Sequence, residues 1–344
     1  MRTFAAVVCA LAAAALLSAP AAAAPRYSII ALSHADRTVY EVAPDTGRIL
    51  HALAMPADPH AAAVSPDGRT IYVSIPTLGL VDVIDARTFT IAGRLDSPSF
   101  RRPPVKGPDG RTTTSALPSG LALTSDGTKL YVGLRLAPRP ALVDIDLRTK
   151  QSRPVDLGLQ GAGAFAIQPG TDWLYAPFRA DNRVVVLDTG DNRRIATIRV
   201  DGGPAGVGFA PNGDVWFNGD ADGGVAVASS MTNRIERVLR TGGRGIGRVA
   251  VSPDGRYVAS THSGSRNVAI LDARGRRMLA TVPTGNGPAF PIFSPDSTTL
   301  FVMNRGQGDI AVIDLKTMKV TARWKVGTDP FGGALRFLGR PSPR

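Results

Sequence analysis

The sequence predicts an all-β fold, a seven-bladed β-propeller, and three observations support this prediction. A turn signature recurs at a fixed interval, short apolar runs flank each turn, and no helical period of apolar residues appears after residue 25. The prolines of four successive turns are each 42 residues apart (211 − 169, 253 − 211 and 295 − 253). A strict period near 40 residues, with several short strands in each unit, is typical of β-propellers.

One unit, residues 289–326, illustrates the four strands expected in each blade, named a to d from the channel axis to the rim. They correspond to residues 290–293, 300–303, 309–314 and 320–326. Ser294-Pro295-Asp296 separates strands a and b, because proline presets the backbone angle and aspartate caps the turn. The third strand and the aspartate turn after it recur at 83–88, 144–149, 186–189 and 270–273.

Six turn signatures are visible, and the two ends of the chain supply a seventh blade. Residues 28–32, 38–42 and 48–53 read as strands b, c and d without a strand a, whereas residues 333–337 read as a strand a with nothing after it. Pro330 lies one period after Pro288 (330 − 288 = 42). We therefore expect the N- and C-terminal strands to share one blade, which closes the ring and removes exposed sheet edges.

Three of the expected b strands share a motif: Ile71-Tyr72-Val73-Ser74, Leu130-Tyr131-Val132-Gly133 and Leu300-Phe301-Val302-Met303-Asn304. With these motifs, each after a Ser-(Pro)-Asp turn, the chain resembles the YVTN-type β-propeller repeat family over residues 27–338. The resemblance implies the seven-bladed fold. It implies little about function, because related propellers serve as lactonases, lyases, periplasmic dehydrogenase subunits, haem binders and nucleic-acid or surface binders.

The first 24 residues have the composition of a secretory signal peptide, with Arg2 as the only charge and an apolar run over residues 4–17. Residues 25–344 are expected to form one propeller domain. Cys9 would be lost with the signal, which excludes disulfides, thiolate ligands and covalently attached haem. No second apolar segment reaches membrane-spanning length. We expect a periplasmic or secreted monomer.

Candidate site residues gather on the face where the b–c and d–a connections of a propeller meet. Counting from the turn prolines places His60, Ser119, Gly163, Ala205, Gly247, Ala289 and Phe331 at the channel mouth. The same counting gives the b–c loop positions His34, Ile75, Leu134, Phe178, Asp220, His262 and Asn304. His34, His60 and His262 are therefore candidates for catalysis, as general acids or bases or as part of a metal site, and Asp220 and Asn304 for ligand binding. The alternative is that b–c loops simply favour small polar residues, and no metal ligand is assigned.

The same face is expected to be cationic. Arg135, Arg179 and Arg305 lie in b–c connections, and an insertion at about residues 96–116 breaks the period with a basic, proline-rich loop. That loop contains Arg101, Arg102, Lys106 and Arg111. The formal net charge of +12 has two explanations: an anionic partner, or the arginine-rich composition of a GC-rich genome, since only six of the 40 basic residues are lysines.

These features favour an exported, non-enzymatic binding or accessory propeller that engages an anionic ligand, an anionic polymer, nucleic acid or an acidic partner protein. The alternatives are a lactonase- or lyase-type enzyme that uses the histidines, and a subunit associated with a periplasmic dehydrogenase. Nucleophile-elbow, zinc-protease and phosphate-loop motifs are absent, and glutamate occurs only at Glu41 and Glu236. The sequence names no cofactor.

Deletion of residues 99–112 tests the role of the basic insertion. The propeller should stay folded, and its affinity for heparin or single-stranded DNA should fall, because exposed cations attract polyanions through long-range, salt-screened forces. Binding measured at low and high salt decides the question. If the deletion variant binds these anions as tightly as the parent, the basic charge reflects composition alone.

Overall fold

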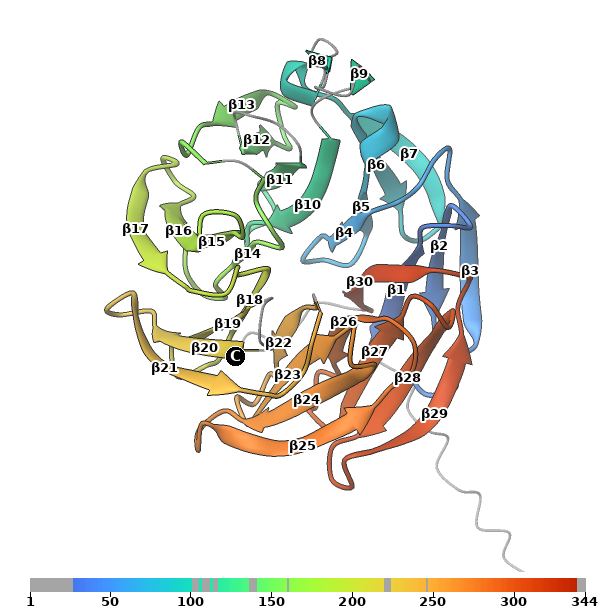
Figure 1. Cartoon of the computed structure of the whole chain (residues 1–344). Coiled ribbons are helices and arrows are strands. Elements are labelled where there is room, and N and C mark those ends of the chain that lie inside the picture. The colour runs from blue at the N-terminus through green and yellow to red at the C-terminus, as the bar shows by residue number, and fades with distance from the viewer. Residues whose placement is uncertain are drawn as a thin grey trace, which may run out of the picture.

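The computed structural model describes residues 27–100, 117–135, 141–159, 161–219, 224–245 and 247–338, and the backbone of 105–106 and 112–113. These residues form a ring of seven four-stranded sheets (Figure 1), which confirms the predicted all-β, seven-bladed propeller. No helix in these ranges is long and apolar enough to cross a membrane. The predicted signal peptide, Asp220 and the side chains of Arg101, Arg102, Lys106 and Arg111 lie outside the described residues.

The strands follow the order predicted for blades, and we number the blades along the chain. Blade 1 contains β1 (Tyr27–Ser33), β2 (Thr38–Val42), β3 (Ile49–Ala54) and β30 (Pro330–Phe337). Blade 2 contains β4 (Ala61–Val64), β5 (Thr70–Ile75), β6 (Leu80–Asp85) and β7 (Thr90–Leu95). Blade 3 contains β10 (Leu117–Leu123), β11 (Lys129–Arg135), β12 (Leu142–Asp146) and β13 (Ser152–Val155). Blade 4 contains β14 (Ala166–Ile167), β15 (Trp173–Phe178), β16 (Arg183–Asp188) and β17 (Arg194–Arg199). Blade 5 contains β18 (Gly206–Phe209), β19 (Asp214–Asn218), β20 (Gly224–Ser229) and β21 (Arg234–Arg240). Blade 6 contains β22 (Val249–Val251), β23 (Tyr257–His262), β24 (Asn267–Asp272) and β25 (Arg277–Pro283). Blade 7 contains β26 (Pro288–Phe293), β27 (Thr299–Asn304), β28 (Asp309–Asp314) and β29 (Lys319–Lys325).

The region of the insertion differs from its prediction as a segment without strands. β8 (Val105–Lys106) and β9 (Thr112–Thr113) form a two-stranded antiparallel ladder at the edge of the ring (Figure 1). Before them, the short 3-10 helix η2 (Pro98–Phe100) places Phe100, only 3% exposed, in the core between blades 2 and 3. Phe100 is thus part of the core, so the deletion that tests the loop should begin at residue 101.

The ring closes in blade 1, as predicted. β1 pairs antiparallel with β30, from Tyr27 opposite Phe337 to Ser33 opposite Pro330, and the sheet order is β3-β2-β1-β30. Figure 1 shows the two strands side by side, blue against red. The inner strand β30 contacts both β26 and β4, so the inner strands of blades 7, 1 and 2 adjoin and the ring is continuous where it closes.

The turns explain why the repeat is so regular. In the a–b turns an aspartate accepts a hydrogen bond from the preceding hydroxyl, as between Ser65 Oγ and Asp67 Oδ1 at 2.5 Å. In the c–d turns the fourth residue after the aspartate has positive φ, for example Phe89 at 54° after Asp85. Phe89 ends the four-residue loop between the paired residues Asp85 and Thr90. A separate bulge lies at Ala92, where the register shifts, and bulges increase the local twist of a strand.

The hydrophobic core is divided among the blades. Seven clusters of buried residues occur, each shared by two neighbouring blades, for example blades 1 and 2 around Ile30, Ile71 and Phe89. Each strand alternates, so one set of side chains packs against the blade before it and the other against the blade after it. A blade is therefore stable only between two neighbours.

A buried ion-pair cluster reinforces the closing strand. Glu41 on β2 is 1% exposed and accepts hydrogen bonds from Ser28 Oγ (2.5 Å), His51 Nδ1 (2.8 Å) and Arg336 Nη1 on β30 (2.7 Å). Burial alone would raise the pKa of Glu41, but the hydrogen bonds from Ser28, His51 and Arg336 outweigh it and lower that pKa. His51 also stacks on Phe89, with ring centroids 5.1 Å apart, so this histidine stabilises the blade.

We predict that Arg336→Met destabilises the protein by up to about 3–5 kcal/mol, the usual cost of leaving a buried charge without its partner. The pKa of Glu41 is lowered by folding, so its contribution is complete above the unfolded value of about 4.3 and is lost as the pH falls through the folded value. Urea unfolding at several pH values should therefore show the difference from the parent shrinking in acid. An equal stability of variant and parent at pH 7 would contradict this role of Arg336.

Candidate functional site

A cavity of about 1030 Å³ opens where the inner strands meet the b–c and d–a connections, and we call it the mouth cavity. Its wall includes one residue from each blade at the position that the sequence period assigns to the channel mouth: His60, Ser119, Gly163, Ala205, Gly247, Ala289 and Phe331. The 42-residue period thus locates a continuous wall made by all seven blades.

The residue that directly follows each mouth residue in the sequence determines how open this cavity is. Five of the seven blades have glycine or alanine there, and the two exceptions are Arg248 and Phe290. Gly247, beside Arg248, has no room for a side chain, because a Cβ atom there would lie 1.7 Å from the carbonyl oxygen of Thr261. Small residues leave space at the cavity wall, which Arg248 and Phe290 also line.

The predicted b–c loop positions prove to be one residue out of register. All five described residues at these positions are buried at the end of a b strand: Ile75, Phe178, His262 and Asn304 are the last residue of theirs, and Leu134 is the last but one. The following residue turns toward the mouth cavity instead, and this position holds Arg135, Arg179, Ser263 and Arg305. In blade 1 the corresponding residue is His34, because Ser33 pairs with Thr38 as His262 pairs with Asn267.

Arg248 is the most confined cation of the mouth cavity. Its Nη1 donates to the carbonyl oxygen of Ala205 on the neighbouring blade (3.2 Å), which fixes the guanidinium across the inner wall. Burial lowers the pKa of Arg248 to about 10, so it stays charged at neutral pH. No carboxylate in the described part of the chain pairs with it. A desolvated cation without a counter-charge is unfavourable, and an anion entering the cavity would relieve this cost.

Arg305 is neutralised. Its Nε and Nη2 atoms bind the two carboxylate oxygens of Asp329 at 2.7 and 2.9 Å, and its guanidinium lies 4.6 Å from the ring centroid of Phe331. Asp329 is the acidic residue among the described lining residues, against four arginines, Arg135, Arg179, Arg248 and Arg305. The cavity therefore has a positive potential.

His60 and His34 flank the same phenylalanine but differ in their contacts. The ring centroids of His60 and His34 lie 4.9 and 6.4 Å from that of Phe331. His34 contacts Asp58 through Nε2 (3.1 Å) and lies 3.9 Å from Asp329, outside the lining of the cavity. His60 lines the cavity, and its Nδ1 lies 3.2 Å from the carbonyl oxygen of Ser119.

The imidazole of His60 is neutral at physiological pH. Burial lowers its pKa to about 4, and the positive charges of Arg135 and Arg248 act in the same direction, against the hydrogen bond to Ser119. Because a carbonyl oxygen only accepts hydrogen bonds, Nδ1 carries the proton and Nε2 carries the lone pair. No described residue forms a hydrogen bond with this Nε2 atom.

His262 and Asn304, two of the residues predicted for the site, have structural contacts. His262 is 2% exposed; its Nδ1 donates to Asn267 Oδ1 (3.2 Å) and its Nε2 accepts from Thr241 Oγ1 (2.9 Å). Asn304 is fully buried and donates to the Thr284 carbonyl oxygen and to Asp309. Neither side chain reaches the mouth cavity. Both belong to the joints between neighbouring blades.

Among the described residues, no group of three or more His, Cys, Asp or Glu side chains is arranged to hold a metal ion. Arg248, Asp58 and Asp329 were not predicted from the sequence. Arg248 stands directly after a mouth position, where the strand alternation could have placed it on the wall; Asp58 and Asp329 stand in d–a connections, whose course the period does not determine.

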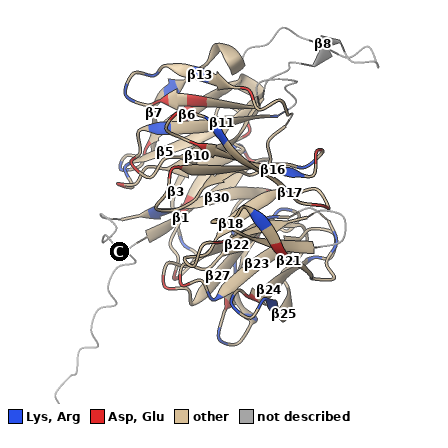
Figure 2. Ribbon diagram, turned by 90° about the vertical axis from the view of Figure 1, so that its left-hand side faces the viewer, with Lys and Arg blue, Asp and Glu red and all other residues tan. Residues whose placement is uncertain are grey.

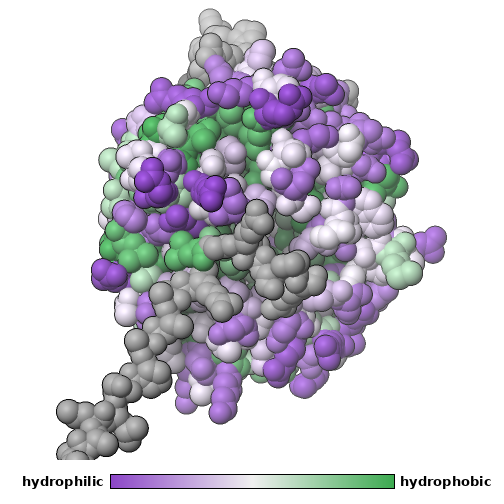
Figure 3. Space-filling view, turned by 180° about the vertical axis from the view of Figure 1, so that it is seen from behind, coloured by the Kyte–Doolittle hydropathy of each residue, from purple (hydrophilic) through white to green (hydrophobic). Residues whose placement is uncertain are grey.

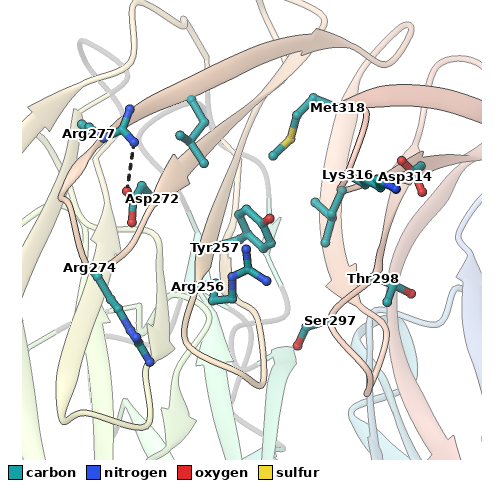
Figure 4. Close-up of a pocket in the computed structure, with 12 residues that line it drawn as sticks. Arg256, Tyr257, Asp272, Arg274, Arg277, Ser297, Thr298, Asp314, Lys316 and Met318 are labelled. Carbon is teal, nitrogen blue, oxygen red and sulfur yellow. Dashed lines mark ion pairs between the residues drawn. The ribbon is translucent and has the colours of Figure 1, made fainter.

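A second hollow of about 840 Å³ lies between blades 6 and 7, near the a–b and c–d turns (Figure 4). Arg256, Arg274, Arg277 and Lys316 contribute cations, and Asp272 pairs with Arg277 at 3.4 Å. Tyr257 and Met318 face one another across it. In this groove Asp272 and Asp314 offset the four cations, whereas the described lining of the mouth cavity has Asp329 alone against four arginines. The groove therefore has a weaker positive potential than the mouth cavity.

Outside these two hollows, the described surface mixes charged and hydrophobic residues. Charged residues of both signs occur mainly in turns and at strand ends (Figure 2). The face in Figure 3 is largely hydrophilic, with hydrophobic residues in separate patches. The exposed large hydrophobic residues come from different strands and loops: Ile49, Leu78, Met231, Val238, Leu279, Phe337 and Leu338.

Many solved structures resemble this fold, including the following three. Hydrazine synthase of Kuenenia stuttgartiensis matches with a TM-score of 0.66 and 21% identity, over 80% of this chain and 88% of that chain. Dihydro-heme d1 dehydrogenase NirN in complex with DHE matches with a TM-score of 0.63 and 18% identity, over 89% of this chain and 65% of that chain. A functionally unknown protein from Desulfotomaculum acetoxidans DSM 771 matches with a TM-score of 0.71 and 14% identity, over 90% of this chain and 99% of that chain. At these identities the likeness shows the fold alone.

Scans against protein-family models and a search of curated proteins gave no match.

The contacts of His262 predict that His262→Ala lowers stability and leaves the mouth cavity unchanged. We expect a loss of about 1–3 kcal/mol, because the buried ring is removed and Thr241 and Asn267 each lose a partner. Thermal unfolding of this variant beside Thr241→Val, which removes one of the same hydrogen bonds, measures the effect. An unchanged melting temperature in both variants would show that the buried hydrogen bonds are not structural.

Proposed function

We propose that this protein is a binding or accessory propeller that takes an anionic ligand into the mouth cavity. The single observation that carries the proposal is Arg248, a confined guanidinium without a described carboxylate partner. Arg135, which ends β11 of blade 3, adds a second positive charge to the lining of the same cavity. Arg305 is already neutralised by Asp329, so Arg248 and Arg135 are the cations that would bind the anion directly.

Geometry favours a small anionic ligand over a polymer for this cavity. A volume of about 1030 Å³ is at the upper end of the range of small-molecule sites. The lining offers polar groups from several blades, and Phe290 and Phe331 supply apolar area. The polar lining residues include Arg135, Arg248, His60, Ser119 and Ser263. A carboxylate-bearing organic molecule fits this mixture, since guanidinium groups bind carboxylates through paired hydrogen bonds.

The neighbours support ligand binding in this fold, because NirN was solved in complex with DHE. Membership of the YVTN-type family, export to the periplasm or beyond, a monomeric state and an acidic partner for the basic insertion remain parts of the proposal. A lactonase- or lyase-type activity is the second candidate, supported by the neutral His60 in the cavity.

The test is titration calorimetry of the full chain with citrate at low salt. Arg135→Ala/Arg248→Ala should weaken binding roughly 10- to 100-fold, because hydrogen bonds to charged groups contribute about 1.5–3 kcal/mol. Raising the salt concentration should weaken binding to the parent as well.

The matched control is Arg274→Ala/Lys316→Ala, which removes the same number of positive charges from the groove between blades 6 and 7. It should bind citrate as the parent does. If both double variants bind equally, net charge rather than the mouth cavity governs binding, and the proposal is wrong.

A further inference from the structure

We propose that His60 binds, through its Nε2 atom, a metal ion that enters the mouth cavity already enclosed in a flat, carboxylate-bearing chelate of the metalloporphyrin class. The inference deepens the proposed function and rests on it, because Arg135 and Arg248 would hold the carboxylates of the same ligand. Its own basis is the arrangement of His60.

The orientation of the His60 ring is fixed from behind. The Ser119 carbonyl oxygen accepts from His60 Nδ1 at 3.2 Å and from Ser74 Oγ at 2.7 Å, and Ser119 is 5% exposed. Histidines that bind metals usually donate their other ring N–H to a carbonyl or carboxylate oxygen in this way, which sets the tautomer and leaves the second nitrogen as a donor atom.

His262 shows how a structural histidine differs in the same fold. Both of its ring nitrogens have protein partners, Asn267 and Thr241, and its ring is buried. The Nε2 of His60 has no partner among the described residues, and its ring lines a cavity. The polar atom is therefore available to a ligand.

The electrostatics restrict which metal species can approach. Arg135 and Arg248 act on His60 with positive charge, and a free divalent cation would be repelled. The described residues also supply no set of three donors that could hold a bare ion. A metal ion whose other positions are filled by an anionic chelate avoids both difficulties, because the complex needs one donor and carries carboxylates that the arginines attract.

The walls fit a flat molecule. Phe331 lies against His60 with ring centroids 4.9 Å apart, and Phe290 projects from the next blade. Ala61, Gly120, Ala164 and Gly332 provide wall without side-chain bulk, so a planar ring can approach the backbone. Aromatic faces beside a planar ligand add favourable contact area.

The experiment titrates the full chain with haemin and, separately, with metal-free protoporphyrin IX, which carries the same carboxylates. The parent should shift the main absorption band of haemin, and His60→Ala should abolish this shift and weaken haemin binding on the order of 10- to 100-fold. His60→Gly supplemented with imidazole should recover the shift. His51→Gln, which removes a histidine from the outer strand β3, is the matched control and should behave as the parent does.

The two ligands separate the inference from the proposed function. Arg135→Ala/Arg248→Ala should weaken both porphyrins, whereas His60→Ala should weaken haemin alone. If haemin and metal-free protoporphyrin bind the parent with equal affinity, or His60→Ala keeps the spectral shift, the assignment of His60 is wrong and anion binding still stands. If the arginine variant binds both as the parent does, the proposed function fails as well.

Discussion

The antiparallel pairing of β1 with β30 is the interaction on which the rest of the structure depends. Each blade buries its apolar side chains only against two neighbours, so a gap at one place would expose a face of blade 1 and a face of blade 7 or 2. The pair is held by ladder hydrogen bonds and by Arg336, which reaches the buried Glu41 across the sheet. Closure also brings Phe331, Asp329 and the inner wall of blade 1 to the mouth cavity.

The mouth cavity follows from what the inner strands lack. Seven strands converge on one axis, and large side chains at every position would fill the space between them. Glycine and alanine at five of the seven positions after the mouth residues keep it open. The exceptions, Arg248 and Phe290, then define the chemistry, because a charged group and an aromatic ring face a common space. The proposed ligand contacts thus come mainly from the few residues that depart from the repeat.

The sequence predicts the repeat well and the departures from it poorly. Proline and aspartate turns fix the blade count and the ring closure, since each determines local backbone conformation. The mouth positions follow from the same period. His262 shows the limit: alternate strand residues point to opposite sides, so an error of one residue exchanges a buried position for an exposed one. Counting placed His262 in the loop, whereas Ser263 and Arg305 occupy the exposed register.

Partners from different blades are harder still to predict. The pairing of Arg305 with Asp329 and of His34 with Asp58 depends on how d–a connections cross between blades, and these connections carry no repeated signature. The buried cluster of Glu41 joins residues that are 295 positions apart, Glu41 and Arg336. No local pattern specifies such a contact.

The shared blade also sets the order in which the chain can assemble. Blades 2 to 7 are made from continuous segments, whose hairpins can form while synthesis continues, but blade 1 needs a strand from each end. Until β30 has left the ribosome, the inner edge of β1 has no partner and Glu41 has no arginine. The loop-closure entropy of joining such distant segments grows slowly with length, so the main constraint is one of timing. Ring closure is therefore the last step in the assembly of the blades.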